Sequence, residues 1–276
     1  MRNASLRQFA GPVRAVVSDL AGTTVDFGSC APAGAFVELF RQRGIVLSQE
    51  EARGPMGTHK MDHIRALASL PRVASEWRGL HGRDWDEADI ARLYREFIPL
   101  QLKVLPRFND LVPGTLDAIE RLGACGIPVA VTTGYNRMML ETVLAGCRAG
   151  GFEPDAAVCA DDVPRGRPAP WMIFRAMERL GAFPPEAVVS IGDTLADAEA
   201  GRNAGTWTVG VVRTGNLVGL SREELDRLEA GEAGARCARA REALEKAGCH
   251  YTVDGIGDLP RVVEEIGTRL ASGEHP

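Results

Sequence analysis

A short apolar run that ends in a carboxylate constrains the fold of this chain more than any other stretch. The run AVVSD at residues 15–19 is followed at once by a small, glycine-containing turn. We expect Ala15 to Ser18 to form a buried parallel strand that delivers Asp19 at its carboxyl end, where open α/β sheets bind their ligands. A carboxylate there can bind a cation or act as a nucleophile, and it can equally begin a turn or cap a helix. This stretch alone leaves both interpretations open.

The chain beyond residue 113 alternates helices with strands. The pattern predicts helices over 115–125, 137–147, 170–180, 195–203 and 259–270, and strands over 127–132, 157–159, 187–191, 206–212 and 251–253. Such alternation favours a doubly wound parallel sheet. Residues 33–108, by contrast, show helical periodicity and almost no strand signal. We therefore predict an α/β core at residues 1–27 and 106–276, with an all-helical insertion at residues 28–105.

Local signals inside the insertion predict two helix starts. Ser48 and Glu51 have the spacing of a capping box, so a short helix is expected to begin near Gln49. Thr58 is the expected N-cap of the next helix. Lys60 then lies in the first turn, where the positive end of the helix dipole disfavours a second positive charge and favours the neutral amine.

Composition argues against several classes of protein. The 276 residues carry a net charge of -5 with a pI near 5.7, which argues against a nucleic-acid or anionic-membrane partner. No apolar run approaches the roughly 20 residues of a membrane span, and residues 1–11 lack the apolar segment of a signal peptide. The six cysteines have no CxxC spacing, which fits a reduced compartment better than a disulfide framework or a zinc site. We therefore expect a cytoplasmic protein.

Three further strand ends carry polar groups that suit an anionic ligand. Thr133 and Gly134 place a hydroxyl and a backbone N–H after one predicted strand, Arg167 lies in the loop after the next, and Asp193 and Asp197 follow a third. Each group also has a structural interpretation as a helix cap, a surface ion pair or a turn residue. A parallel sheet brings the carboxyl ends of neighbouring strands to one edge, so we expect the groups to meet there.

Together these residues resemble the motifs of the haloacid dehalogenase superfamily of phosphoryl-transfer enzymes. Asp19 matches the nucleophile, Thr133 the second motif, and Asp193 with Asp197 the acidic fourth motif, while Arg167 stands in place of the usual third-motif lysine. The resemblance implies a Rossmann-like core, with the helical insertion as its cap domain.

The resemblance also implies a magnesium site. Asp19, Asp193 and the backbone carbonyl of Ala21 would bind Mg2+, which reduces the repulsion between an anionic nucleophile and an anionic substrate. Thr133, Gly134 and Arg167 would bind the phosphoryl oxygens.

Residue 21 departs from the superfamily's pattern. Typical phosphatases of the superfamily have a general-acid Asp two residues after the nucleophile, and this chain has Ala21. An enzyme without that acid either is impaired as a phosphomonoesterase or releases a leaving group that needs no proton from that position. A carbon leaving group next to an aldehyde satisfies this condition if a lysine condenses with the aldehyde, because cleavage of the carbon–phosphorus bond then releases a neutral enamine. Lys60 is the candidate, since only three of the 32 basic residues are lysines and arginine cannot form that bond.

The resemblance narrows to the phosphonoacetaldehyde hydrolase (phosphonatase) family. The matching stretches run through nearly the whole chain, at residues 19–26, 55–67, 133–135, 161–164, 166–168, 203–205 and 207–210. This resemblance implies hydrolysis of the small phosphonate phosphonoacetaldehyde to acetaldehyde and phosphate. Lys60 would form the Schiff base, and Asp19 would attack phosphorus to give an aspartyl phosphate that water hydrolyses. A homodimer formed through the cap is also implied.

Five other residues enter through the resemblance. Met56 and Tyr135 match residues that line the family's site, and His63, on nearly the same helical face as Lys60, matches a candidate proton shuttle; each has an equally open packing interpretation. Leu20 stands where the family commonly has Trp, and Ser29 replaces a cysteine of some members. We expect Leu20 to alter packing and not chemistry.

Two other functions remain open at this point. The first is a magnesium-dependent phosphomonoesterase or phosphomutase of the same superfamily, which the fold favours and Ala21 disfavours. The second is a catalytically silent protein that binds a phosphorylated ligand, because a fold does not guarantee activity.

Overall fold

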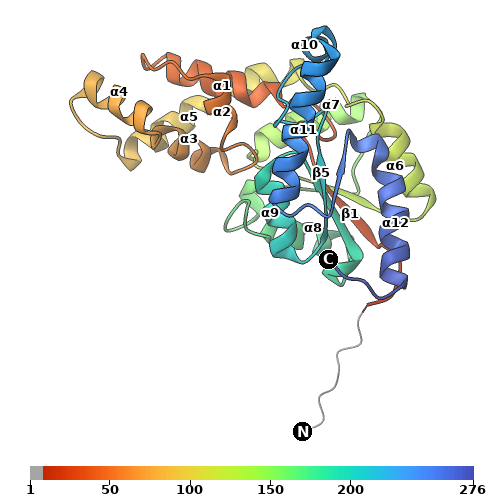
Figure 1. Ribbon diagram of the computed structural model, residues 1–276. Helices are drawn as coiled ribbons and strands as arrows, with labels where there is room; N and C mark the ends of the chain where they lie inside the picture. Colours follow the sequence, from red (N-terminus) through yellow and green to blue (C-terminus); the bar gives the residue numbers. More distant parts are fainter. Residues whose placement is uncertain (1–8) are drawn as a thin grey trace.

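The computed structural model describes residues 9–276, and its centre is one six-stranded parallel sheet (Figure 1). The strands lie in the order β3-β2-β1-β4-β5-β6, with every neighbouring pair parallel. Their bounds are β1 (Ala15–Asp19), β2 (Val129–Thr133), β3 (Ala156–Cys159), β4 (Val188–Gly192), β5 (Trp207–Val211) and β6 (Tyr251–Val253). The predicted doubly wound α/β fold is therefore confirmed.

Helices cover both faces of the sheet. The helices outside the insertion are α6 (Thr115–Ala124), α7 (Arg137–Ala149), α8 (Trp171–Leu180), α9 (Leu195–Ala204), α10 (Arg222–Arg227), α11 (Ala230–Lys246) and α12 (Leu259–Ala271), with short 3-10 helices at Leu105–Arg107, Ala160–Asp162, Pro185–Ala187 and Ile256–Asp258. Side chains alternate along each strand. Val16 and Val189 pack with α6 and α12 on one face, whereas Val17 and Val188 pack with α8 and α9 on the other.

Five helices between β1 and β2 form a separate lobe beside the sheet (Figure 1). Their bounds are α1 (Cys30–Arg41), α2 (Gln49–Arg53), α3 (Lys60–Ala68), α4 (Pro71–His81) and α5 (Glu87–Val104). Phe36, Ile64, Leu93 and Phe97 are fully buried together, as their helical spacing predicts. The all-helical insertion is confirmed, while its division from the core at residues 28 and 105 stays a prediction. Residues 1–8 of the predicted core, and most of the stretch examined for a signal peptide, lie outside the described residues.

Two local predictions inside this lobe have different outcomes. The capping box is confirmed: the Ser48 hydroxyl accepts a hydrogen bond from the Glu51 backbone N–H, and the Glu51 carboxylate accepts one from the Ser48 N–H. The prediction of Thr58 as an N-cap is wrong. Its hydroxyl donates to the Pro55 carbonyl instead, and the ring of His59 caps α3 by accepting from the Met61 N–H. Lys60 is nevertheless in the first turn, as expected.

The linker from β1 to the lobe has an unusual backbone. Asp26 and Ser29 have φ of 54° and 49°, and no other non-glycine residue of the described chain has a positive φ. The Asp26 carboxylate accepts hydrogen bonds from the N–H groups of Cys30 and Ala31 and so satisfies the first turn of α1. Hydrogen bonds between the Asp26 side chain and the first turn of α1 therefore hold the linker in place.

No helix within residues 9–276 combines the length and the apolar character that crossing a bilayer requires.

Trp77 provides a test of the packing of the lobe. It is fully buried and stacks on Trp85 with ring centroids 3.5 Å apart. Trp77→Ala is expected to lower the free energy of unfolding by about 3–5 kcal/mol, because it removes this packing and leaves a cavity. Trp171, which is 47% exposed, is the control: Trp171→Ala is expected to cost less than about 1 kcal/mol. Urea unfolding of both variants checks the difference, and equal losses would contradict it.

Candidate active site

The order of the strands brings the predicted polar groups to one edge of the sheet. Asp19 at the end of β1 is in register with Thr132 of β2, and Asp193 follows the last residue of β4, the strand on the other side of β1. Thr133 ends β2 in register with Cys159 of β3. The carboxyl ends of four neighbouring strands therefore surround one point.

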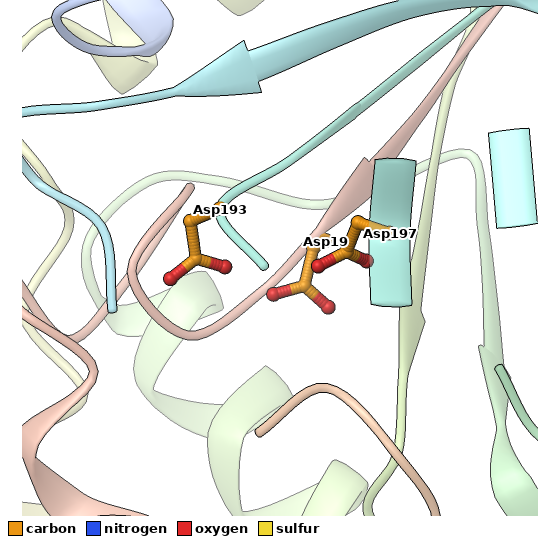
Figure 2. A group of neighbouring side chains, drawn as sticks. All are labelled: Asp19, Asp193 and Asp197. Carbon is orange, nitrogen blue, oxygen red and sulfur yellow. The ribbon is translucent and has the colours of Figure 1, made fainter. Parts of the chain in front are cut away.

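Three carboxylates form the centre of this site. Asp19, Asp193 and Asp197 place one carboxylate oxygen each within 4.8 Å of the others. Figure 2 shows the three side chains converging from the end of β1, from the loop after β4 and from the start of α9. All three are at most 9% exposed. Buried carboxylates at this spacing repel one another, so they require a counter-charge.

Arg167 supplies a counter-charge within the chain. Its guanidinium lies 2.7 Å from Asp19 Oδ1 and 2.7 Å from Asp197 Oδ1, and it also donates a hydrogen bond to the Thr132 hydroxyl at 2.7 Å. The arginine is 5% exposed. The alternative of a surface ion pair is therefore wrong, because this ion pair is buried among the strand ends.

The individual oxygen atoms of the cluster differ in what they contact. Asp197 is fully used: Oδ1 binds Arg167, and Oδ2 accepts from the Thr194 backbone N–H and hydroxyl in a capping box for α9. Asp193 Oδ2 accepts from the Asn216 backbone N–H at 2.7 Å, whereas its Oδ1 is buried without a hydrogen-bond partner. Asp19 binds Arg167 through Oδ1 only. Asp19 and Asp193 are thus the members with an oxygen left for a cation, and Asp197 orients Arg167.

The environment raises the pKa of Asp19 and of Asp193, the two carboxylates that each keep an oxygen for a cation. Burial raises the pKa of Asp19 from 3.8 to about 6, and the neighbouring Arg167 opposes that shift. Burial also raises the pKa of Asp193 well above 3.8, and the charges of Asp19 and Asp197 act in the same direction. Burial therefore disfavours the charged form of both carboxylates unless a cation lies close to them.

Lys60 reaches the same site from the helical lobe. Its amine is 4.0 Å from the Met56 sulfur and lies 5.1 Å from the centre of the Tyr135 ring and 5.6 Å from that of Phe36. Only 3% of the residue is exposed. Burial lowers the pKa of Lys60 from 10.5 to about 8, while the charge of Asp19 opposes the shift. A substantial fraction of neutral amine is therefore available near physiological pH.

A cavity of about 20 Å³ lies between the lobe and the sheet edge. Its walls contain nine of the predicted site residues together with Ser29, Pro32, Gly57 and Thr194; the nine are Asp19, Ala21, Met56, Lys60, Thr133, Gly134, Tyr135, Arg167 and Asp193. Its size is that of about one water molecule. The lobe is thus closed over the strand ends, and a substrate can enter only if the lobe moves away.

Glycine lets the lobe approach the sheet edge this closely. Gly57 has φ of 86°, and a β-carbon there would lie 2.2 Å from the Thr194 hydroxyl oxygen. A β-carbon on Gly134 would lie 2.5 Å from the Thr58 carbonyl oxygen. Any larger side chain at either position would therefore hold the lobe away from the site.

His63 lies beside this cavity but does not line it. Its ring stacks on Phe36 at a centroid distance of 3.8 Å, and its Nε2 is 2.9 Å from the Ala52 carbonyl oxygen. Burial lowers its pKa well below 6.5. Its contacts match the packing interpretation, and its role as a proton shuttle stays a prediction.

Residue-level reasoning missed the groups that surround the cluster from other elements. Asn216 binds Asp193 from the loop after β5, and Arg53 at the end of α2 binds Asn216. Asn216 follows a strand end, so the rule that pointed to Asp193 also applied to it. Arg53 carries no comparable signal, because it is one of 29 arginines.

Comparison with known proteins assigns the class. Residues 13–205 match the family model of haloacid dehalogenase-like hydrolases. The chain therefore belongs to the haloacid dehalogenase-like hydrolases. A β-phosphoglucomutase from Clostridium difficile shares the fold, with a TM-score of 0.65 at 16% identity over 93% of this chain and 98% of its own.

Closer relatives identify the family within this class. A protein from Syntrophobacter fumaroxidans named phosphonoacetaldehyde hydrolase is 45% identical over 98% of both chains, and one of that name from Paraburkholderia phytofirmans is 42% identical over 96% of this chain and 99% of its own. The crystal structure of a phosphonoacetaldehyde hydrolase-like protein from Oleispira antarctica matches 100% of both chains with a TM-score of 0.97 at 41% identity. The chain belongs to the phosphonoacetaldehyde hydrolase family, and it is an enzyme.

Gly57 provides a test of the closed arrangement. Gly57→Ala adds a methyl group against Thr194 at a positive φ, so it is expected to hinder closure and to lower kcat/KM by roughly tenfold or more, which corresponds to about 1–3 kcal/mol of strain. Gly79→Ala in α4 is the control, because its new methyl group meets nothing within 4 Å. Steady-state kinetics of the two variants separates the effects, and a fully active Gly57→Ala enzyme would show that closure does not need this contact.

The buried amine of Lys60 predicts a gain in stability when the amine is removed. Since the pKa of Lys60 is lower in the folded state, burial of the charged amine costs about 3 kcal/mol at pH values below about 8, where the amine is protonated in both the folded and the unfolded chain. The cost disappears as the pH rises from about 8 to 10.5. Lys60→Met is therefore expected to stabilise the fold by up to about 3 kcal/mol at pH 7 and by little above pH 10. Urea unfolding against pH measures this, with exposed Lys103→Met as the unchanged control; a pH-independent effect would contradict the prediction.

Proposed function

We propose that this enzyme hydrolyses phosphonoacetaldehyde to acetaldehyde and phosphate, through a Schiff base on Lys60 and a phosphorylated Asp19. One observation carries the proposal: a buried lysine amine and a strand-end carboxylate share one cavity, while the position of the general acid holds Ala21. The names of the relatives support the substrate.

Lys60 prepares the leaving group. Its neutral amine attacks the aldehyde carbon, and uptake of a proton with loss of water gives an iminium. Burial lowers the pKa of Lys60 to about 8 and so increases the fraction of this nucleophilic form. The faces of Phe36 and Tyr135 flank the amine at 5.6 and 5.1 Å, where they stabilise a positive charge that is shielded from water.

Asp19 accepts the phosphoryl group. Its carboxylate oxygen attacks phosphorus, and the electrons of the carbon–phosphorus bond move into the iminium to give a neutral enamine. Protonation of the enamine carbon and hydrolysis of the resulting imine release acetaldehyde and restore Lys60. Water then hydrolyses the aspartyl phosphate to phosphate. Neither step needs an acid at position 21.

Arg167, Thr133 and Gly134 are proposed to bind the phosphonate oxygens. Arg167 pairs with Asp19 and Asp197 and also lines the cavity. A guanidinium offers several N–H donors in one plane, which suits a group with three oxygens.

The acidic cluster fits a magnesium ion. Asp193 Oδ1 is buried without a partner, only Oδ1 of Asp19 is held by Arg167, and all the available donors are oxygens, which Mg2+ prefers. Asp19, Asp193 and the Ala21 carbonyl are the proposed ligands. When bound, the ion neutralises charge between the nucleophile and the substrate.

The helical insertion is proposed to act as a cap. Residues 28–105 would open to admit the substrate and close to bring Lys60 to Asp19 and exclude water, which protects both covalent intermediates. We also propose a cytoplasmic homodimer, in line with the resemblance to the family.

Reductive trapping tests the central step. Sodium borohydride added with phosphonoacetaldehyde is expected to reduce the imine and leave a stable adduct on Lys60, detected by peptide mass spectrometry. Lys103 and Lys246 are the internal controls, because both are exposed and neither lines the cavity. A protein that turns over the substrate with no adduct on Lys60 would exclude the Schiff base.

The variant Lys60→Arg separates covalent from electrostatic catalysis. It keeps the positive charge but cannot form an imine, so the expected loss is at least about 1,000-fold in kcat, in line with removal of a covalent catalyst. An active Lys60→Arg enzyme would reduce Lys60 to an electrostatic role. Turnover of sugar phosphates in preference to phosphonoacetaldehyde would instead favour a phosphomonoesterase or phosphomutase.

A further inference from the structure

Arg53 joins the helical lobe to its linker and to the sheet edge through one nitrogen atom. Its Nη1 donates to the carbonyl oxygens of Gly28 at 2.7 Å and Ser29 at 3.1 Å, and to the Asn216 side-chain oxygen at 3.1 Å. Gly28 and Ser29 are the positive-φ residues that lead into α1. One cation on the lobe therefore binds both the linker and a loop of the core.

Asn216 carries this connection to the acidic cluster. Its backbone N–H donates to Asp193 Oδ2 at 2.7 Å, while its side chain faces Arg53. The same loop is held to the turn after β1, because the Thr214 hydroxyl donates to the Gly22 carbonyl at 2.8 Å and the Gly28 N–H donates to the Thr214 carbonyl at 2.8 Å. Asn216 is only 4% exposed, so its contacts are shielded from water.

Arg53 also begins the segment that ends at Lys60. Its carbonyl oxygen accepts from the Met56 N–H at 3.1 Å, which shapes the turn between α2 and α3, and lies 3.4 Å from the Asn216 side-chain nitrogen. Met56 in turn contacts the Lys60 amine. A continuous series of contacts thus runs from Asp193 through Asn216 and Arg53 to Lys60.

We propose that Arg53 and Asn216 are positioning residues that fasten the Lys60 segment to the Asp193 loop, so that the amine and the acidic cluster reach their working positions together. Neither residue lines the cavity. Their effect on the reaction rests on the function proposed above, whereas their effect on the seating of Lys60 does not. The contacts between Arg53 and Asn216 join the lobe to a loop of the core, so they stabilise the closed arrangement that the structure shows.

The seating of Lys60 is measurable without substrate. Brief reductive methylation with formaldehyde and cyanoborohydride, read by peptide mass spectrometry, gives the rate at Lys60 against exposed Lys103 and Lys246 in the same sample. Arg53→Ala and Asn216→Ala are each expected to raise the relative rate at Lys60 by about tenfold, the effect of one lost hydrogen bond to a charged group. The Asn216 variant keeps the backbone N–H that binds Asp193.

One further readout separates positioning from general damage. The effects of the two substitutions are expected to be less than additive in the double variant, because both remove the hydrogen bond between the Arg53 guanidinium and the Asn216 side-chain oxygen. Arg41→Ala, an exposed arginine of α1 that pairs with Glu38, is the control and leaves Lys60 unchanged.

The outcomes decide the proposal in either direction. The proposal would be overturned if Lys60 in folded Arg53→Ala and Asn216→Ala proteins were methylated at the same relative rate as in the wild-type protein. Additive effects in the double variant would also overturn it. An effect of Arg53→Ala alone would assign Arg53 to the linker and remove Asn216 from the connection. If borohydride trapped no substrate on Lys60 of the wild-type enzyme, the proposed function would be contradicted, but the positioning roles of Arg53 and Asn216 would not be.

Discussion

The buried ion pairs of Arg167 hold the sheet edge together. Asp19, Asp193 and Asp197 would repel one another at their observed spacing, and burial makes that repulsion stronger. Arg167 contacts two of the three and the Thr132 hydroxyl as well, which a single lysine amine could not do in the same geometry. The arginine in the third motif thus has a physical role here: a planar group can bind both carboxylates at once.

Burial then tunes the second half of the site. Lys60 comes from a separate lobe, and its low pKa exists only because closure removes the amine from water. The close approach depends on Gly57 and Gly134, which have no side chain to hold the two parts apart. The interface between the lobe and the core therefore buries Lys60 beside the acidic cluster, and the packing of that interface offsets the cost of burying the amine.

Much of the fold and of the sheet-edge site could be predicted from the sequence, because the sequence signals for them are local. The apolar run before Asp19, the alternation of helices and strands after residue 113 and the capping box at Ser48 each depend on a few adjacent residues. Thr58 was misassigned since a threonine and a histidine next to each other can both accept the first N–H of a helix. His63, Met56 and Tyr135 could be named only by resemblance, because packing and function use the same side chains.

The sequence by itself determined the fold class, the strand-end Asp19, the absence of an acid at residue 21 and the rarity of lysine that pointed to Lys60. Only the tertiary structure decided which oxygens of Asp19, Asp193 and Asp197 are already bound, and that Arg53 and Asn216 connect the lobe to the cluster. The reason is physical: strand and helix signals arise from neighbours in the chain, whereas contacts such as those of Asp19 with Arg167 and of Arg53 with Asn216 join residues that lie far apart in the sequence and meet only in the folded chain.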